Sequence, residues 1–217
     1  MRDRAAEANA TRREFLVGTG VVVAAGLMGS LTGPAHAAAA IAHPAPPFSA
    51  TTSSGGRVQL TDHLGKVVVL EWTNHDCPYV RKHYESGNMQ VLQKDAAAKG
   101  VVWLTLISSA PGTQGYVTAA QANELTAKRQ AAPAAVLFDP EGTIGKLYKA
   151  TVTPHMYVID AKGVLDYAGA IDDRPTTRQA DIQGAQNYVR AALEAVLAGQ
   201  AVKTPLTRAY GCTIKYA

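Results

Sequence analysis

Cysteine is scarce in this sequence: the chain has 2 cysteines among 217 residues, Cys77 and Cys212. Two cysteines so far apart can close into one disulfide or act separately, and the sequence leaves both arrangements open, because bridging needs Cα atoms within about 7 Å. The Cys-x-x-Cys pair is absent too, since Val80 stands three residues after Cys77. Valine cannot resolve a mixed disulfide, so disulfide exchange within one two-cysteine motif is excluded.

Long apolar runs and basic clusters are also missing. The formal net charge is only +4, and no basic run is interleaved with aromatic residues, so nothing indicates nucleic-acid binding. Beyond residue 37 no apolar stretch reaches the roughly 20 residues that cross a bilayer. We therefore expect no nucleic-acid partner and no stable membrane span once the N-terminal segment is removed.

Residues 1–37 have the pattern of an export signal. Arg12 and Arg13 precede an apolar stretch, residues 16–28, and residues 35–37 have the small-x-small form of a cleavage site. This pattern resembles a twin-arginine signal peptide, and its apolar part is too short to span a bilayer. It predicts export of an already folded protein and a mature chain in the periplasm or elsewhere outside the inner membrane.

The remaining residues, 217 − 37 = 180 in number, are enough for one domain with a sizeable core. We predict an N-terminal arm or tether at 38–50, a domain at 51–200 and an irregular tail at 201–217 that carries Cys212. Apolar runs predict strands at 57–60, 66–71, 101–107, 135–138, 156–159 and 165–170. Helical patterns predict helices at 78–84, 89–99 (with Asn88 as its N-cap), from Thr118 onward, 143–148 and 182–197. Strands that alternate with helices predict an α/β sandwich with a largely buried sheet.

Cys77 follows a buried strand and a short polar turn, and Pro78 comes directly after it. Proline suits the first position of a helix, so we expect Cys77 at a helix N-terminus, where unpaired N–H groups and the helix dipole favour an anion such as a thiolate. Basic residues within the next two turns would add to this effect (Arg81, Lys82 and His83), although Asp76 opposes them. The alternative is an inert buried cysteine, which would be expected inside the apolar strand. The pattern favours a reactive cysteine.

Two motifs resemble the thioredoxin fold. The first is residues 65–72 leading into Cys77-Pro78, and it resembles the strand-to-cysteine passage of envelope redox proteins and peroxiredoxins. The second, residues 152–160, resembles the segment around that fold's cis-proline, here Pro154, which faces the reactive cysteine. The tail at 210–216 resembles the ending of a single-cysteine subgroup of redoxins. Together these motifs are similar to the peroxiredoxin-like alkyl hydroperoxide reductase/thiol-specific antioxidant group over roughly residues 48–197.

The resemblance implies a thioredoxin-like three-layer sandwich with a central mixed sheet and a thiol-dependent oxidoreductase. Cys77 would attack a peroxide or a disulfide, Cys212 is the candidate resolving cysteine, and an external thiol would act as reductant. Asn74 stands where peroxiredoxins have Thr or Ser, so Asn74 or His75 would have to supply the hydrogen bonds to a peroxide. No cofactor and no metal is implied.

The resemblance implies that Thr153 and Pro154 belong to the surface that binds the substrate. His155 beside Pro154 and His75 near Cys77 are candidates to tune the thiolate or shuttle protons, and Arg174 is a candidate anion clamp. For each of these three the other interpretation is a polar residue of a turn or loop.

Three other functions stay open. In the first, Cys77, His75, His155 and Cys212 converge on Cu(I) or Zn(II). In the second, the protein is a thiol-disulfide accessory protein of the envelope without peroxidase activity. In the third, the chain is a binding or chaperone module whose redox site has been lost.

Overall fold

The computed structural model describes residues 37–217, so almost all of the predicted signal peptide lies outside the described residues. The strands are β1 Ser49–Thr52, β2 Arg57–Gln59, β3 Val68–Trp72, β4 Val102–Ile107, β5 Ala135–Phe138, β6 Val152–Thr153, β7 His155–Ile159, β8 Leu165–Gly169 and β9 Cys212–Thr213. The α-helices are α1 Pro78–Glu85, α2 Asn88–Ala98, α3 Ala119–Lys128, α4 Thr143–Leu147 and α5 Tyr188–Leu197, with 3₁₀ turns at Leu60–His63 (η1) and Gln179–Ile182 (η2).

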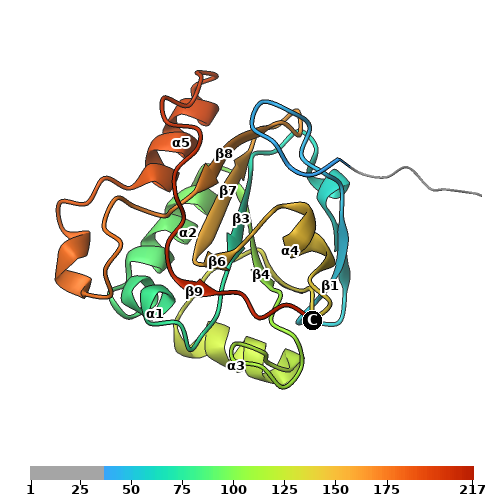
Figure 1. Cartoon of the computed structure of the whole chain (residues 1–217). Helices are drawn as coiled ribbons and strands as arrows, with labels where there is room; N and C mark the ends of the chain where they lie inside the picture. Colours follow the sequence, from blue (N-terminus) through green and yellow to red (C-terminus); the bar gives the residue numbers. More distant parts are fainter. Residues whose placement is uncertain (1–36) are drawn as a thin grey trace, which may run out of the picture. The chain divides into compact units, whose positions relative to one another are not determined.

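A seven-stranded mixed sheet, in the order β2-β1-β5-β4-β3-β7-β8, forms the centre of the domain (Figure 1). Strand β3 is apolar except for Glu71 and is buried along its whole length, as expected for a strand covered on both faces. It pairs in parallel with β4 and antiparallel with β7. The mixed central sheet that we predicted is therefore confirmed.

Side chains that alternate along β3 enter two different layers of the core, because successive residues of a strand point to opposite faces. Leu70 and Trp72 pack with Tyr148, at the end of α4, and with Phe48 from the segment before β1. Val69 packs on the other side with apolar residues of α1, α2 and α5. Elements thus cover both faces of the sheet, which gives the predicted three-layer sandwich.

Three local features differ from the expectations. Residues 38–50 pack closely against the domain: Ala45 N–H donates to the Gly163 carbonyl at 2.8 Å. The final helix does not begin at residue 182 but at Tyr188, where the Asn187 side chain accepts a hydrogen bond from Arg190 N–H, so the predicted start is wrong. The N-cap of α2 is Gly87, with φ of 78°, and not Asn88.

The C-terminal tail, residues 201–217, follows the edge of β8 and then crosses to β6 (red in Figure 1). Ala168 N–H donates to the Pro205 carbonyl at 3.0 Å, and β9 later pairs with β6. In the part of the chain that the structure describes, no helix has both the length and the apolar character needed to cross a bilayer.

Candidate active site around Cys77 and Cys212

Cys77 is the N-cap of α1, with Pro78 at the first helical position, as the sequence predicted. Its backbone is extended (φ −72°, ψ 120°), and its carbonyl accepts the first helical hydrogen bond from Arg81 N–H at 2.9 Å. The side chain is 0 % exposed, and its thiol donates to the Thr153 carbonyl at 3.0 Å. The cysteine therefore has the predicted position at the helix N-terminus, but it is covered.

The cis-proline segment lies opposite Cys77 because β3 and β7 are antiparallel neighbours. Trp72, at the end of β3, pairs with His155, at the start of β7. The loops that follow β3 and precede β7 therefore meet at one edge of the sheet. The Thr153–Pro154 bond is cis, as the resemblance implied, and the Thr153 carbonyl is directed at the Cys77 sulfur.

The tail brings Cys212 beside Thr153 in the same cis-proline segment. Strand β9 pairs with β6 in the register Thr153↔Cys212, and the Thr153 hydroxyl donates to the Cys212 carbonyl at 3.5 Å. Cys212 packs against the buried cluster that contains Cys77, and burial, followed by the interaction with the Cys77 thiol, raises the pKa of the Cys212 thiol. Both cysteines are free thiols, so the structure contains an intramolecular dithiol pair.

Gly211 allows the tail to approach this closely. Its φ is 141°, which strongly favours glycine, and a Cβ atom at this position would lie 1.9 Å from the Thr153 carbonyl oxygen. The tail backbone therefore lies directly against the carbonyl that accepts the Cys77 thiol hydrogen. Any other residue here would push the tail, and Cys212 with it, away from Thr153 and Cys77.

The other predicted site residues make no hydrogen bond or ion pair with either sulfur among the contacts of the described residues. The Asn74 side chain accepts from Asp76 N–H at 2.9 Å and so caps the turn before Cys77. His75 Nε2 lies 3.3 Å from Asp76 Oδ1. The His155 ring stacks on Tyr157, and burial lowers the pKa of His155 to about 4. The Arg174 guanidinium pairs with Asp173 at 3.5 Å and is half exposed. Their roles stay predictions.

The basic residues expected around Cys77 are engaged elsewhere, and this corrects the electrostatic part of the prediction. Arg81 forms a surface pair with Glu85 at 2.8 Å. The Lys82 side chain is buried against Asp172. Burial, with a smaller contribution from Lys82, lowers the pKa of His83 to about 3, so this ring is neutral at physiological pH. Of the electrostatic environment predicted for Cys77, the position at the helix N-terminus is present in the structure and the set of cations is not.

Glu71, which the sequence pattern did not single out, is a buried carboxylate six residues before Cys77. Four side chains of the same core layer donate to it: Tyr84 hydroxyl at 2.8 Å, Trp103 Nε1 at 2.8 Å, Thr105 hydroxyl at 3.2 Å and Gln93 Nε2 at 3.3 Å. Burial raises the pKa of Glu71 in spite of these four bonds. A glutamate inside an otherwise apolar strand is the signal that could have revealed this cluster.

A set of side chains suited to a metal ion does not form at this site. Within residues 37–217, no three or more His, Cys, Asp or Glu side chains come close enough together to hold one. His75 and His155 do not join the two cysteines, so the copper hypothesis has no ligand set of that size in the described domain.

The sequence model of the AhpC/TSA family matches residues 41–168, more than half of the chain. The chain belongs to the AhpC/TSA family. The matched range contains Cys77 and the cis-proline segment but ends before Cys212 and its tail. A comparison with curated proteins gave no match.

Several solved structures share the fold. A hypothetical protein of Sinorhizobium meliloti has a TM-score of 0.70 and 22% identity over 84% of this chain and 97% of its own. An uncharacterized conserved protein of Geobacillus kaustophilus has a TM-score of 0.70 and 25% identity, over 82% and 93%. A proposed thiol:disulfide interchange protein, DsbE, from Chlorobium tepidum has a TM-score of 0.55 and 23% identity, over 74% and 99%. The predicted thioredoxin-like fold is thus confirmed for this AhpC/TSA-family chain, whereas the single-cysteine subgroup and the twin-arginine signal stay predictions.

Proposed function

We propose that this AhpC/TSA-family protein is an exported thiol oxidoreductase in which Cys77 is the reactive cysteine and Cys212 the resolving cysteine. The observation that supports this most strongly is that two cysteines distant in sequence meet at Thr153, beside the cis-proline Pro154: the Cys77 thiol donates to the Thr153 carbonyl, and Cys212 pairs with Thr153 and packs against the cluster that contains Cys77. A core cysteine without a redox role would not need a second cysteine, delivered by a separate strand, next to it.

The proposed reaction begins with attack of the Cys77 sulfur on the outer oxygen of a hydroperoxide. The O–O bond breaks, the thiol proton ends on the leaving alkoxide, and Cys77 becomes a sulfenic acid while the peroxide is reduced to an alcohol. The Cys212 thiol then attacks the Cys77 sulfur and releases water, which forms the Cys77–Cys212 disulfide. An external dithiol reduces this disulfide and is itself oxidised to a disulfide.

The environment of each cysteine supports this division of roles. Cys77 lies at the N-terminus of α1, where unpaired N–H groups favour the thiolate that attacks. Burial and the neighbouring Cys77 raise the pKa of Cys212, which keeps Cys212 as a thiol until the sulfenic acid has formed. The proposed roles of Asn74, His75 and His155 in binding the peroxide or moving its proton complete this mechanism.

The cover over Cys77 favours a small oxidant. The Cys77 side chain is 0 % exposed, and the tail lies beside it. A hydroperoxide needs little room to reach the sulfur, whereas a protein disulfide would have to displace the tail. A groove of about 560 Å³ borders the tail at Gly211 and the cis-proline segment at Val152. We propose that the reductant approaches the disulfide through this groove.

Disulfide exchange without peroxidase activity is the second candidate function. The dithiol pair beside Pro154 suits it equally well, since the same Cys77–Cys212 disulfide would form by exchange with an external disulfide. Consumption of hydrogen peroxide distinguishes the two functions.

The test is mass spectrometry of the reduced protein before and after one equivalent of hydrogen peroxide. The expected product is the Cys77–Cys212 disulfide in the wild type and a dimedone-reactive sulfenic acid on Cys77 in Cys212→Ser. Cys77→Ser, which changes a single atom, should consume no peroxide. Full peroxide turnover by Cys77→Ser would end the proposal, and disulfide formation by oxidised glutathione but not by peroxide would select the second function.

Export is proposed from the N-terminal pattern alone. Replacement of Arg12 and Arg13 by lysine should leave the protein in the cytoplasm if the twin-arginine route is used. Fractionation with an antibody to the mature domain measures this, and unchanged export of the double variant would contradict the proposed route.

A further inference from the structure

Cys212 is held against Cys77 by a backbone pairing that is too short to position it alone. Strands β6 and β9 contain two residues each, and isolated two-strand pairs are marginal in water. Downstream of Cys212, the tail is fastened by Ile214 N–H, which donates to the Thr151 carbonyl at 3.0 Å. Upstream, Tyr210 has the nearest side chain with several partners.

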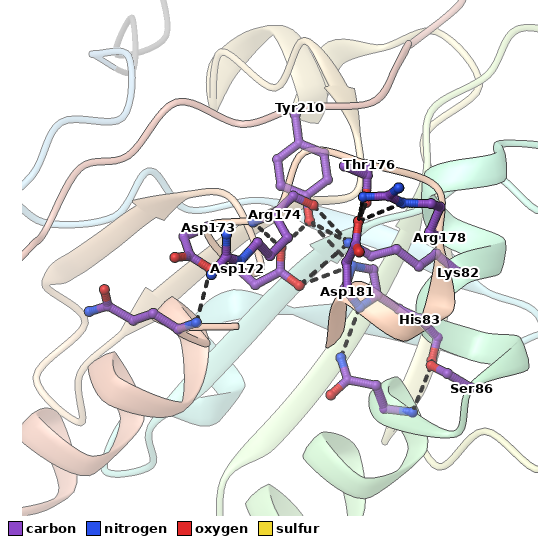
Figure 2. Close-up of polar contacts among 12 residues, drawn as sticks. Lys82, His83, Ser86, Asp172, Asp173, Arg174, Thr176, Arg178, Asp181 and Tyr210 are labelled. Atoms are coloured by element: carbon purple, nitrogen blue, oxygen red, sulfur yellow. Dashed lines mark hydrogen bonds and ion pairs between the residues drawn. The ribbon is translucent and has the colours of Figure 1, made fainter. Parts of the chain in front are cut away.

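The Tyr210 side chain points from the tail into a polar cluster between α1 and the segment after β8 (Figure 2). Its hydroxyl donates to Asp172 Oδ1 and lies 3.4 Å from both Lys82 Nζ and His83 Nε2. We call these four residues, Lys82, His83, Asp172 and Tyr210, the tyrosine anchor. Lys82 and His83 belong to α1, whose N-cap is Cys77. The tail is therefore fixed to the same helix that carries the reactive cysteine.

The tyrosine anchor is built around a buried ion pair. Lys82 Nζ lies 3.6 Å from Asp172 Oδ2, and the two side chains are 0 % and 2 % exposed. Lys82 also donates to the Arg174 carbonyl at 2.8 Å, and Asp172 accepts from Arg174 N–H at 2.9 Å. Buried charges are tolerated when their remaining hydrogen bonds are satisfied. The Tyr210 hydroxyl contacts both members of the pair, so the seated tail completes the hydrogen bonding of these charges.

The neutral members of the tyrosine anchor orient the phenol. The Asn88 amide lies 2.8 Å from His83 Nδ1, and an amide NH₂ can only donate, so the ring hydrogen of His83 is on Nε2 and is available to Tyr210. The Tyr210 ring lies edge-on to Tyr79 of α1, with centroids 5.7 Å apart. Loss of the hydroxyl alone therefore removes the polar contacts and leaves the ring contact in place.

We propose that Tyr210, held by the buried Lys82–Asp172 pair, is a positioning residue that seats Cys212 on Cys77 for disulfide formation. The inference rests on the proposed redox roles of Cys77 and Cys212. Tyr210 acts through the backbone of Gly211 and Cys212, and the close approach of Gly211 to the Thr153 carbonyl makes Cys212 sensitive to any displacement upstream.

The test compares Tyr210→Phe with Tyr148→Phe in the full chain. The Tyr148 hydroxyl is also buried and donates to the Pro46 carbonyl at 2.7 Å, but Tyr148 packs in the core layer on the opposite face of the sheet from α1. Each variant removes one phenol hydroxyl together with its hydrogen bonds, and both should unfold at a lower temperature. Only Tyr210→Phe should alter the chemistry of the cysteines.

The measurement is the equilibrium between the Cys77–Cys212 disulfide and a glutathione buffer, which reports the effective concentration of one thiol at the other. We expect the equilibrium constant for forming the disulfide to fall at least about tenfold in Tyr210→Phe, a rise of about 30 mV in the reduction potential, and to stay at the wild-type value in Tyr148→Phe. In Tyr210→Leu, which also loses the ring contact with Tyr79, the equilibrium constant for forming the disulfide should fall further.

Equal equilibrium constants for wild type and Tyr210→Phe would overturn the positioning role, and so would an equal fall in Tyr148→Phe, because the effect would then be general destabilisation. Peroxide is not needed for this measurement. If hydrogen peroxide fails to oxidise the wild type, the peroxidase proposal fails, while the glutathione equilibrium still decides the role of Tyr210.

Discussion

Gly211 is the residue whose replacement tests the arrangement of the site most directly. In Gly211→Ala the new Cβ would lie 1.9 Å from the Thr153 carbonyl oxygen, whereas carbon–oxygen contacts are normally about 3.3 Å or longer. The two backbones must therefore separate by roughly 1.4 Å, the difference between these two distances. The opposing atom belongs to the backbone beside Pro154, so it cannot turn aside as a side chain would.

The size of the effect follows from the strain and from what the tail loses. A non-glycine residue held at an unfavourable φ such as 141° costs about 1–3 kcal/mol, and release of the tail avoids this strain at the expense of the β6–β9 hydrogen bonds. For a domain of this size, each kcal/mol corresponds to about 2–4 °C, so the unfolding temperature should fall by roughly 2–12 °C. Release of the tail should also uncover Cys77.

The assay is the rate at which a bulky maleimide alkylates Cys77, measured in a Cys212→Ser background so that only one thiol reacts. We expect Gly211→Ala to raise this rate about tenfold or more, as release of a contact worth about 1.4 kcal/mol would. With Cys212 present, formation of the Cys77–Cys212 disulfide should slow to a similar extent. Calorimetry gives the unfolding temperature of the same samples.

Gly199→Ala is the matched control. Gly199 also has a positive φ, 68°, but a Cβ atom there would meet nothing within 4 Å, so only the backbone preference is lost, about 1 kcal/mol. This variant should unfold at a slightly lower temperature and alkylate at the wild-type rate. If Gly211→Ala behaves like Gly199→Ala in the alkylation assay, the close approach of the tail to Thr153 does not control access to Cys77 and the reasoning is refuted.

Three further predictions concern the buried polar groups. Lys82→Met leaves Asp172 buried without its cation, which costs about 3–5 kcal/mol, so calorimetry should show an unfolding temperature lower by on the order of 10 °C. Tyr84→Phe removes one donor to the Glu71 carboxylate and should lower the free energy of unfolding in urea by about 1.5–3 kcal/mol. Burial raises the pKa of Glu71 above its ordinary value of 4.5, so the folded state holds this proton more tightly than the unfolded chain. The free energy of unfolding should therefore decrease as the pH rises from about 4.5 through the folded-state pKa, and Glu71→Gln should remove this decrease.

Each of these predictions has a clear contradicting result. An unchanged unfolding temperature for Lys82→Met would mean that Asp172 is not buried in solution. A Tyr84→Phe variant as stable as the wild type would show that Glu71 does not depend on that donor. Identical pH dependence for Glu71→Gln and wild type would show that Glu71 has the same proton affinity in the folded and unfolded states.

The order of the elements and the position of Cys77 could be predicted because they depend on local patterns. The apolar run before the site can only be a buried strand, and Pro78 fixes the helix start at the next residue, so Cys77 had to be the N-cap. The cis bond before Pro154 followed from the resemblance of the surrounding segment. Each of these features is encoded within about ten consecutive residues.

Neither the proximity of Cys212 to Cys77 nor the tyrosine anchor could be predicted from local patterns, because both features depend on pairing between distant segments. Strand β9 has two residues and no periodicity of its own, so nothing local places Cys212 beside Thr153. Lys82 and His83 have the composition of a solvated helix face, yet the segment after β8 and Tyr210 cover them. Burial of polar residues by another segment is invisible in the pattern of either segment alone.

The Thr153 carbonyl would also act as a built-in reporter of the redox state. In the dithiol form it accepts the Cys77 S–H hydrogen, and a disulfide sulfur has no hydrogen to give. Oxidation would thus remove the donor from one identified peptide group, which changes the electron distribution of its C=O bond. With a ¹³C label on the Thr153 carbonyl carbon, the chemical shift of this one atom should differ between the dithiol and disulfide forms. Its NMR resonance would therefore report the redox state without any added dye or second enzyme.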